Sequence, residues 1–173
     1  RYNIGMIMRK EMKKNMTIYL DMDGVIANFF GGIEKYFNVP HWKQIPKTEE
    51  SILSLKGTDF FNTLDVYDTS DELVEFVKTL TDDWGICSSP LRGDRDNSAY
   101  WKLIFTGQKE RYAVSKIDGS PNILVDDKPD NIARWEAKGG IGIRYQANQD
   151  SLEELQGKLT SAYEGVNHFY ALN

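Results

Sequence analysis

Short apolar segments alternate with amphipathic helical patterns along most of this chain of 173 residues. Apolar, β-branched or aromatic content predicts strands at residues 17–20, 84–87, 112–114, 122–125 and 141–145. Helical spacing and capping signals predict helices at residues 26–37, 69–80, 97–105 and 129–138, and a last helix capped by Ser151 and Glu154. This alternation is typical of a three-layer α/β fold with a mostly parallel, five-stranded sheet.

The stretch from residue 41 to residue 65 interrupts this alternation. It is long for a plain loop, so we predict a small helical cap at about residues 38–65, inserted after the first helix. The remainder of residues 17–173 is predicted to form one domain around it, large enough to bury about two thirds of its unfolded surface.

Charge is distributed unevenly between the start of the chain and its body. Residues 1–16 carry +4 of a chain whose net charge is −5, which leaves −9 for the remaining residues. We interpret residues 1–16 as a basic tail without a catalytic role, with an arm that attracts phosphate as the alternative. The acidic body argues against a nucleic-acid polymer as partner, because such binding needs a basic groove.

Other bulk features narrow the class of protein further. The single cysteine, Cys87, excludes an internal disulfide framework and suits a reducing compartment, so a cytoplasmic location is expected. No apolar run is long enough to span a membrane. The sequence does not determine the oligomeric state, and a homodimer is one of the alternatives.

Polar residues follow four of the predicted strands. They are Asp21 and Asp23, Ser88 and Ser89, Lys116, and Asp126 and Asp127. Ligands of open α/β sheets bind beyond the carboxyl ends of the strands, so these side chains are expected to converge on one crevice. Mg²⁺ prefers one or two carboxylates, several waters and a phosphate oxygen, which this set can offer. We therefore expect Mg²⁺ as cofactor.

This ordered set resembles the haloacid dehalogenase superfamily of phosphotransferases. The four motifs stand here as Asp21-Met22-Asp23-Gly24-Val25, Ile86-Cys87-Ser88-Ser89-Pro90, Lys116, and Asp126-Asp127-Lys128-Pro129-Asp130. The phrases DMDGVIANF, ICSSPL and ILVDDKPD, and the ten-residue step from Lys116 to Asp126, are similar to those of the 5′(3′)-deoxyribonucleotidases. The resemblance implies a phosphatase acting on nucleoside monophosphates.

The resemblance also implies a role for each motif residue. Asp21 is expected to be the nucleophile and Asp23 the general acid and base, with Ser88 and Lys116 holding the phosphoryl group. The backbone near Ser89 is expected to help. The expected metal ligands are Asp21, the Asp23 carbonyl and Asp127, while Asp126 is expected to support them through a water or Lys116.

Residues for the base are expected on the first helix and in the cap. The resemblance places Phe29 at a base contact, and Trp42, Phe60 and Phe61 could stack further on the base. Plain core packing is the alternative for Phe60 and Phe61. Arg92 and Arg95 stand in a segment where the resemblance leads us to expect a lysine near the phosphate, so either arginine could replace that lysine.

Several alternatives remain open at the level of sequence. Lys116 could be a solvated surface lysine, with Lys109 or Arg111 in its place. Asp126 and Asp127 could cap a helix beside Pro129 as well as bind a metal. The substrate could be another small phosphoester or a nucleic-acid 3′ end, and the chain could be a phosphate-binding module without activity.

Overall fold

The computed structural model describes residues 15–89 and 103–172, with side chains as far as residue 165. Its centre is a parallel five-stranded sheet in the order β3-β2-β1-β4-β5. The strands are β1 (Ile18–Leu20), β2 (Trp84–Ser88), β3 (Leu103–Phe105), β4 (Ile123–Asp126) and β5 (Ile141–Arg144). The predicted α/β class and the five-stranded parallel sheet are confirmed.

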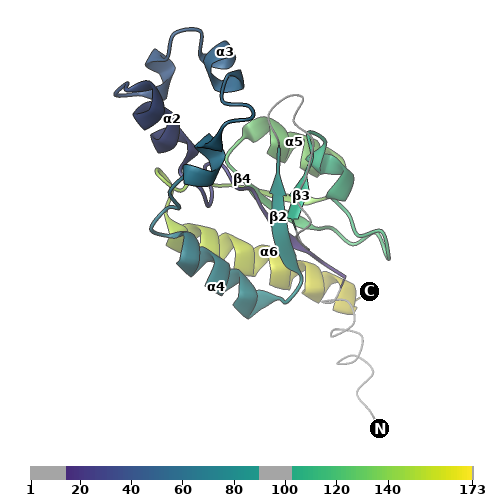
Figure 1. Cartoon of the computed structure of the whole chain (residues 1–173). Helices are drawn as coiled ribbons and strands as arrows, with labels where there is room; N and C mark the ends of the chain where they lie inside the picture. Colours follow the sequence, from purple (N-terminus) through teal and green to yellow (C-terminus); the bar gives the residue numbers. More distant parts are fainter. Residues whose placement is uncertain (1–14, 90–102, 173) are drawn as a thin grey trace.

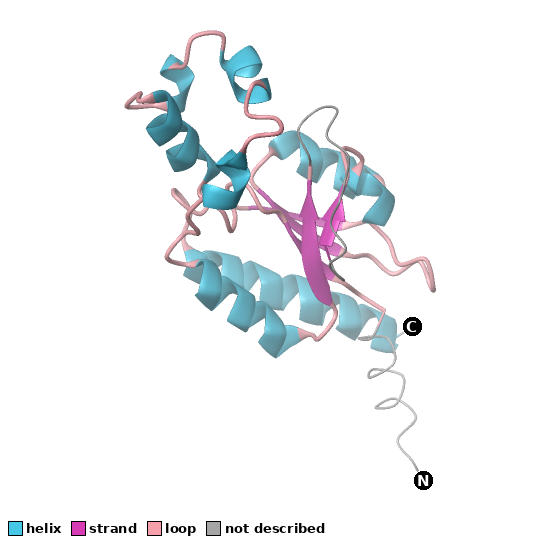
Figure 2. Ribbon diagram, in the orientation of Figure 1, coloured by secondary structure: helices cyan, strands magenta, loops and turns pink. Residues whose placement is uncertain are grey.

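Helices cover both faces of the sheet (Figures 1 and 2). On one face α4 (Ser70–Leu80) and α6 (Leu152–Leu172) lie side by side, and on the other lies α5 (Pro129–Ala137). Alternate residues of each strand point to opposite faces, so Leu20 packs in the cluster of α4 and α6 whereas Tyr19 packs beside Trp135 of α5. The central strands are apolar on both sides because both sides are covered.

The residues between β1 and α4 form a separate helical unit that protrudes from the body (Figure 1). It contains α2 (Phe29–Phe37), η1 (Trp42–Gln44), α3 (Thr48–Leu53) and η2 (Asp59–Thr63). Its own hydrophobic cluster is centred on Ile33, Ile45, Leu55 and Phe60. α2 contributes Phe29, Ile33 and Phe37 to this cluster, so the unit with a shared core spans residues 29–64.

The two ends of this unit pair with each other. Ala27 and Val66 form an isolated antiparallel bridge, Asn28 N donates to Asp65 O (2.8 Å), and Tyr67 N donates to Ile26 O (2.9 Å). The helical unit therefore joins the body through two short paired segments directly after the loop that carries Asp21 and Asp23.

The third predicted strand is wrong. Residues 109–112 form the 3₁₀ helix η3 (Lys109–Tyr112), and Val114 makes only an isolated bridge to Pro121. The edge strand β3 lies instead at Leu103–Phe105, where the sequence predicted the end of a helix. A run of three apolar residues fits either element, and here pairing with β2 decides for the strand. Residues 97–102 of the predicted helix lie outside the described residues.

The start of the helix predicted at residues 69–80 differs from its capping signal, in which Thr69 is the N-cap residue. α4 begins at Ser70 as expected, but Thr69 makes no side-chain capping bond. Ser70 instead donates from Oγ to the carbonyl of Ile26 (2.7 Å), so this hydroxyl ties the helix to the loop after β1.

Two further expectations concern the ends of the chain and membranes. Residues 1–14 of the predicted tail lie outside the described residues, whereas Met16 is 1% exposed and belongs to the main core. None of the helices in the described ranges is long and apolar enough to cross a bilayer.

Candidate active site

The acidic residues gather at the carboxyl edge of the sheet, between its two central strands. β1 and β4 are neighbours, yet the chain leaves β1 toward β2 and leaves β4 toward β5. Helices that diverge in this way leave a crevice at the strand ends, where ligands of α/β proteins bind. Asp21 follows β1, Asp126 ends β4, and the backbone N–H of Asp21 donates to Val125 O (2.8 Å).

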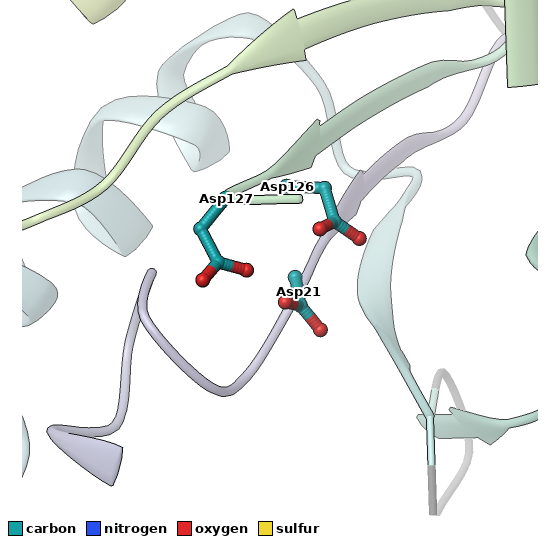
Figure 3. Close-up of side chains that lie close together, drawn as sticks. All are labelled: Asp21, Asp126 and Asp127. Carbon is teal, nitrogen blue, oxygen red and sulfur yellow. The ribbon is translucent and has the colours of Figure 1, made fainter. Parts of the chain in front are cut away.

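Three carboxylates meet at this edge (Figure 3). Asp21, Asp126 and Asp127 are 4%, 0% and 8% exposed, and each offers an oxygen that lies within 4.8 Å of the others. Oδ1 of Asp127 is buried and accepts no hydrogen bond from the described residues. Oxygen donors in this number and proximity suit a divalent cation such as Mg²⁺.

A buried lysine joins two of these carboxylates. Lys109, which is 1% exposed, donates from Nζ to Asp21 Oδ1 (2.7 Å) and to Asp126 Oδ2 (2.6 Å). Burial opposes the ammonium charge, but the two carboxylates outweigh it, so the pKa of Lys109 is raised and the side chain is charged. Lys109 therefore places a fixed positive charge beside the candidate nucleophile.

The placement of Lys116 in the crevice is wrong. Its Nζ lies 6.0 Å from the centre of the Tyr112 ring, and the residue lines a hollow of about 310 Å³ that it shares with Thr17 and Asp83. Thr17 precedes β1 and Asp83 precedes β2, so this hollow lies at the amino edge of the sheet. The error follows from the misplaced third strand, because Lys109 is the lysine that comes after the real β3.

Burial also alters the proton affinity of the acidic residues. It raises the pKa of Asp21 to about 8, against the opposing effect of Lys109 and with further increases from Asp126 and Asp127. It raises the pKa of Asp23 to about 6, with Asp21 adding to the increase. The pKa of Asp127 is also raised to about 6, by burial and by Asp126. Without a divalent cation these carboxyl groups take up protons at a higher pH than an exposed aspartate does.

A polar chain behind the site fixes Asp126. Asn131 of α5 donates from Nδ2 to Asp126 Oδ2 (3.0 Å), and Arg134 donates to Asn131 Oδ1 (2.8 Å). Arg134 Nε also lies 3.6 Å from Glu110, the residue after Lys109. The sequence analysis missed this support, although Asn131 and Arg134 follow the Asp126-Asp127 motif at helical spacing.

Gly24 makes room for Asp127 in the loop after β1. Its φ of +83° is in the left-handed region, which favours glycine, and a Cβ at this position would lie 2.6 Å from Asp127 Oδ2. From the other side, Arg144 Nε donates to the Asp127 carbonyl (3.3 Å). The close approach of the two loops therefore depends on glycine at this position.

The predicted phosphate-holding residues are only partly described. Ser88 is 3% exposed and ends β2, whose pairing with β1 brings Ile86 opposite Leu20. Ser88 therefore lies at the same edge of the sheet as Asp21. Ser89 follows Ser88 and is partly buried. Arg92 and Arg95 lie outside the described residues.

The predicted base-contacting aromatic residues all belong to the helical unit. Phe29 stacks on Phe61, with ring centres 6.2 Å apart and planes 8° apart. Phe60 is 6% exposed and also packs against Phe29, which favours core packing for this residue. The Trp42 ring lies 5.6 Å from that of Phe30 and has Lys43 Nζ 5.7 Å from its centre.

Comparisons with known proteins returned similarities to solved structures. No protein-family model and no curated protein matches this chain. It is similar to a predicted HAD-like family hydrolase from Porphyromonas gingivalis (12% identity, 83% of this chain and 97% of that one, TM-score 0.43). It is also similar to the HAD domain of the effector Lem4 from Legionella pneumophila (13% identity, 88% and 97%, TM-score 0.47). A third is a HAD family hydrolase from Deinococcus radiodurans R1 with bound phosphate and sodium (10% identity, 88% and 96%, TM-score 0.43).

Proposed function

We propose that this protein is a Mg²⁺-dependent phosphomonoesterase of the haloacid dehalogenase type. The observation that carries the proposal is the contact of Lys109 Nζ with Asp21 Oδ1 at 2.7 Å, beside the carboxylates of Asp126 and Asp127. A carboxylate nucleophile, a fixed cation and a cluster of metal-binding oxygens are the parts that such hydrolysis needs.

A divalent cation fits the residues present. Asp21 and Asp127 would hold it, because Asp127 Oδ1 is buried without a partner among the described residues whereas Asp126 is already bound by Lys109 and Asn131. The bound cation would supply positive charge that keeps the carboxylates ionised and offsets the charge of a phosphate dianion. Asp126 would position Lys109 instead of binding the metal directly.

In the first step, a carboxylate oxygen of Asp21 attacks the phosphorus atom and the bond to the leaving oxygen breaks. The leaving oxygen takes a proton from Asp23, whose pKa of about 6 suits both proton donation and acceptance near neutral pH. The product of this step is an aspartyl-phosphate on Asp21. Lys109 stabilises the added negative charge by its ammonium group.

In the second step, water attacks the phosphorus of the aspartyl-phosphate. Asp23 takes the proton from this water, the bond between phosphorus and Asp21 breaks, and inorganic phosphate leaves. Asp21 returns to its carboxylate form. The same carboxyl group of Asp23 therefore serves as acid and then as base.

A nucleoside monophosphate is the proposed substrate, and a 5′(3′)-deoxyribonucleotidase is the proposed type of enzyme. The sequence motifs and the aromatic helical unit next to the Asp21–Asp23 loop support this proposal. The packing of Phe60 in the core of that unit leaves Phe29, Phe61 and Trp42 as the residues for base stacking. A panel of nucleotides and sugar phosphates would test it, and equal rates on both would favour a general small-phosphoester phosphatase.

The mechanism is tested by Asp21→Asn with Asp71→Asn as a matched control. Asp71 lies exposed in the first turn of α4, away from the site. Asp21→Asn should lower kcat by at least about 1,000-fold, because an amide is a poor nucleophile, whereas Asp71→Asn should retain wild-type turnover. Acid quenching of the wild-type reaction with labelled substrate should leave label on Asp21. Turnover by Asp21→Asn close to wild type would overturn the mechanism.

A further inference from the structure

Two tyrosine hydroxyls share an unusual property with the metal-binding carboxylate. Among the described residues, the buried side-chain oxygens without a hydrogen-bond partner include Tyr67 Oη, Tyr145 Oη and Asp127 Oδ1. Burying a hydroxyl without a partner costs free energy, so such groups are rare and call for an explanation. The mechanism above uses neither hydroxyl.

Strand register places Tyr145 beside Asp127. Asp126 of β4 pairs with Arg144 of β5, and the next residues along the two chains are Asp127 and Tyr145. Tyr145 N donates to the Asp126 carbonyl (3.0 Å), which continues the pairing beyond the strands. Side chains alternate across the sheet, so Asp127 lies on the same face as Val125 and Tyr145 on the same face as Ile143. This is the face that α4 and α6 cover. Tyr145 is 1% exposed.

Tyr67 adjoins the loop after β1, which packs against Asp127. Its backbone N–H donates to Ile26 O (2.9 Å), where the helical unit rejoins the body next to the Asp23 loop. Burial raises the pKa of Tyr67 to about 12, with smaller increases from Asp127, Asp23, Tyr145 and Glu34. The backbone of Tyr67 therefore adjoins the loop that carries Asp23 and Gly24, and Gly24 packs against Asp127.

A backbone hydrogen bond joins the segment after β5 to the loop after β1. Ala147 N donates to the carbonyl of Gly24 (2.9 Å), and Gly24 in turn packs against Oδ2 of Asp127. The segment after β5 and the loop after β1 thus enclose Asp127 from two sides. A hydroxyl is both donor and acceptor, so it can accept a hydrogen bond from a water molecule that a cation holds.

We propose that Tyr67 and Tyr145 are positioning residues whose hydroxyl groups bind the water shell of the divalent cation held at Asp127. This inference rests on the proposed function, because it requires that a cation binds there. Mg²⁺ retains several waters in protein sites, and groups that contact those waters or the ligands fix the position of the ion. On this proposal, the hydrated cation supplies hydrogen-bond partners for the two hydroxyl groups.

The test compares Tyr67→Phe and Tyr145→Phe with Tyr36→Phe, a control in α2 whose side chain is 56% exposed. Calorimetric titration with Mg²⁺ should show affinity about tenfold weaker or more for the two site variants, and wild-type affinity for the control. Without metal, the melting temperature of Tyr145→Phe should equal or exceed that of wild type, because a buried hydroxyl without a partner is removed. The increase in melting temperature on adding Mg²⁺ should be smaller in both site variants.

Failure of this inference is separable from failure of the proposed function. If wild type binds Mg²⁺ and hydrolyses phosphoesters while both tyrosine variants bind Mg²⁺ with unchanged affinity, the inference is overturned and the function stands. If wild type neither binds Mg²⁺ nor releases phosphate, both are overturned. A tyrosine variant that loses stability without metal would indicate a packing role for the hydroxyl, which also contradicts the inference.

Discussion

Lys109 is the residue around which the candidate site is assembled. It reaches Asp21 and Asp126 from η3, a short 3₁₀ helix at the edge of the sheet, and is almost completely buried. A buried ammonium is stable only with partners of opposite charge, and removing one member leaves the others uncompensated. The same contacts that stabilise Lys109 hold the carboxylate of Asp21 in a fixed position.

A matched pair of variants tests the assignment of the lysine. Lys109→Met should lower kcat by about 100-fold or more and should also destabilise the fold by about 3–5 kcal/mol, because two buried carboxylates lose their cation. Lys116→Met should leave both kcat and stability close to wild type, because Lys116 lies at the opposite edge of the sheet. Phosphate release and urea unfolding would measure the two effects. Loss of activity in Lys116→Met with an active Lys109→Met would contradict the assignment.

At the scale of elements, the helical unit of residues 29–64 depends on the close packing of α2. Gly32 lies inside this helix, and a Cβ there would clash with Leu64 Cδ2 and lie 3.3 Å from Phe60 Cζ. The glycine weakens the helix by about 1 kcal/mol relative to alanine, but it allows η2 and the residue after it to pack directly on α2. The aromatic residues proposed for the base depend on this packing.

Two glycine substitutions should therefore have opposite signs. Gly32→Ala should lower the free energy of unfolding by about 1–3 kcal/mol, because overpacking exceeds the gain in helix propensity. Gly157→Ala in α6, where a Cβ would meet nothing within 4 Å, should raise it by about 0.5–1 kcal/mol. Urea denaturation measures both values. Stabilisation by Gly32→Ala equal to that by Gly157→Ala would show that α2 is not closely packed.

At the scale of the whole molecule, the site links stability to pH and to metal. The folded-state pKa values of Asp21, Asp23 and Asp127 are raised by burial, so the folded protein binds more protons than the unfolded chain above pH 4. Stability from these groups is present at low pH and is lost as pH rises through about 6 and then about 8. Lys109 does not contribute to the change of stability with pH between about pH 4 and pH 8. Its ordinary pKa already lies well above this range, and its two carboxylate partners raise it further.

The melting temperature of the metal-free protein should consequently fall between about pH 5 and pH 8. Saturating Mg²⁺ should reduce this fall, because metal competes with protons and binds more tightly at higher pH. In the absence of metal, Asp21→Asn should show a shallower dependence than wild type, since the group with the highest of the three pKa values is gone. Differential scanning calorimetry at several pH values measures this. A melting temperature that is constant across this range without metal would contradict the raised pKa values.

Local patterns in the sequence were sufficient for much of the fold. Apolar runs predicted β1, β2, β4 and β5 to within one residue at every end, and the Asp21 and Asp126-Asp127 motifs lie at adjacent strand ends. These features depend on side chains close in sequence, whose periodicity is visible without the fold. β3 was missed because the apolar residues 103–105 fit the end of a helix as well as a strand, and only pairing with β2 decides between them.

The sequence by itself therefore determined the α/β class and the acidic residues that follow the central strands. Only the tertiary structure decided which lysine joins them, because burial of Lys109 depends on the pairing of β3 with β2 and on carboxylates 88 and 17 residues away. It also decided that the segments carrying Tyr67, Tyr145 and Asp127 meet beside the loop after β1, where backbone hydrogen bonds join them. Contacts between distant segments follow from strand order and loop closure, and neither is encoded in any single local pattern.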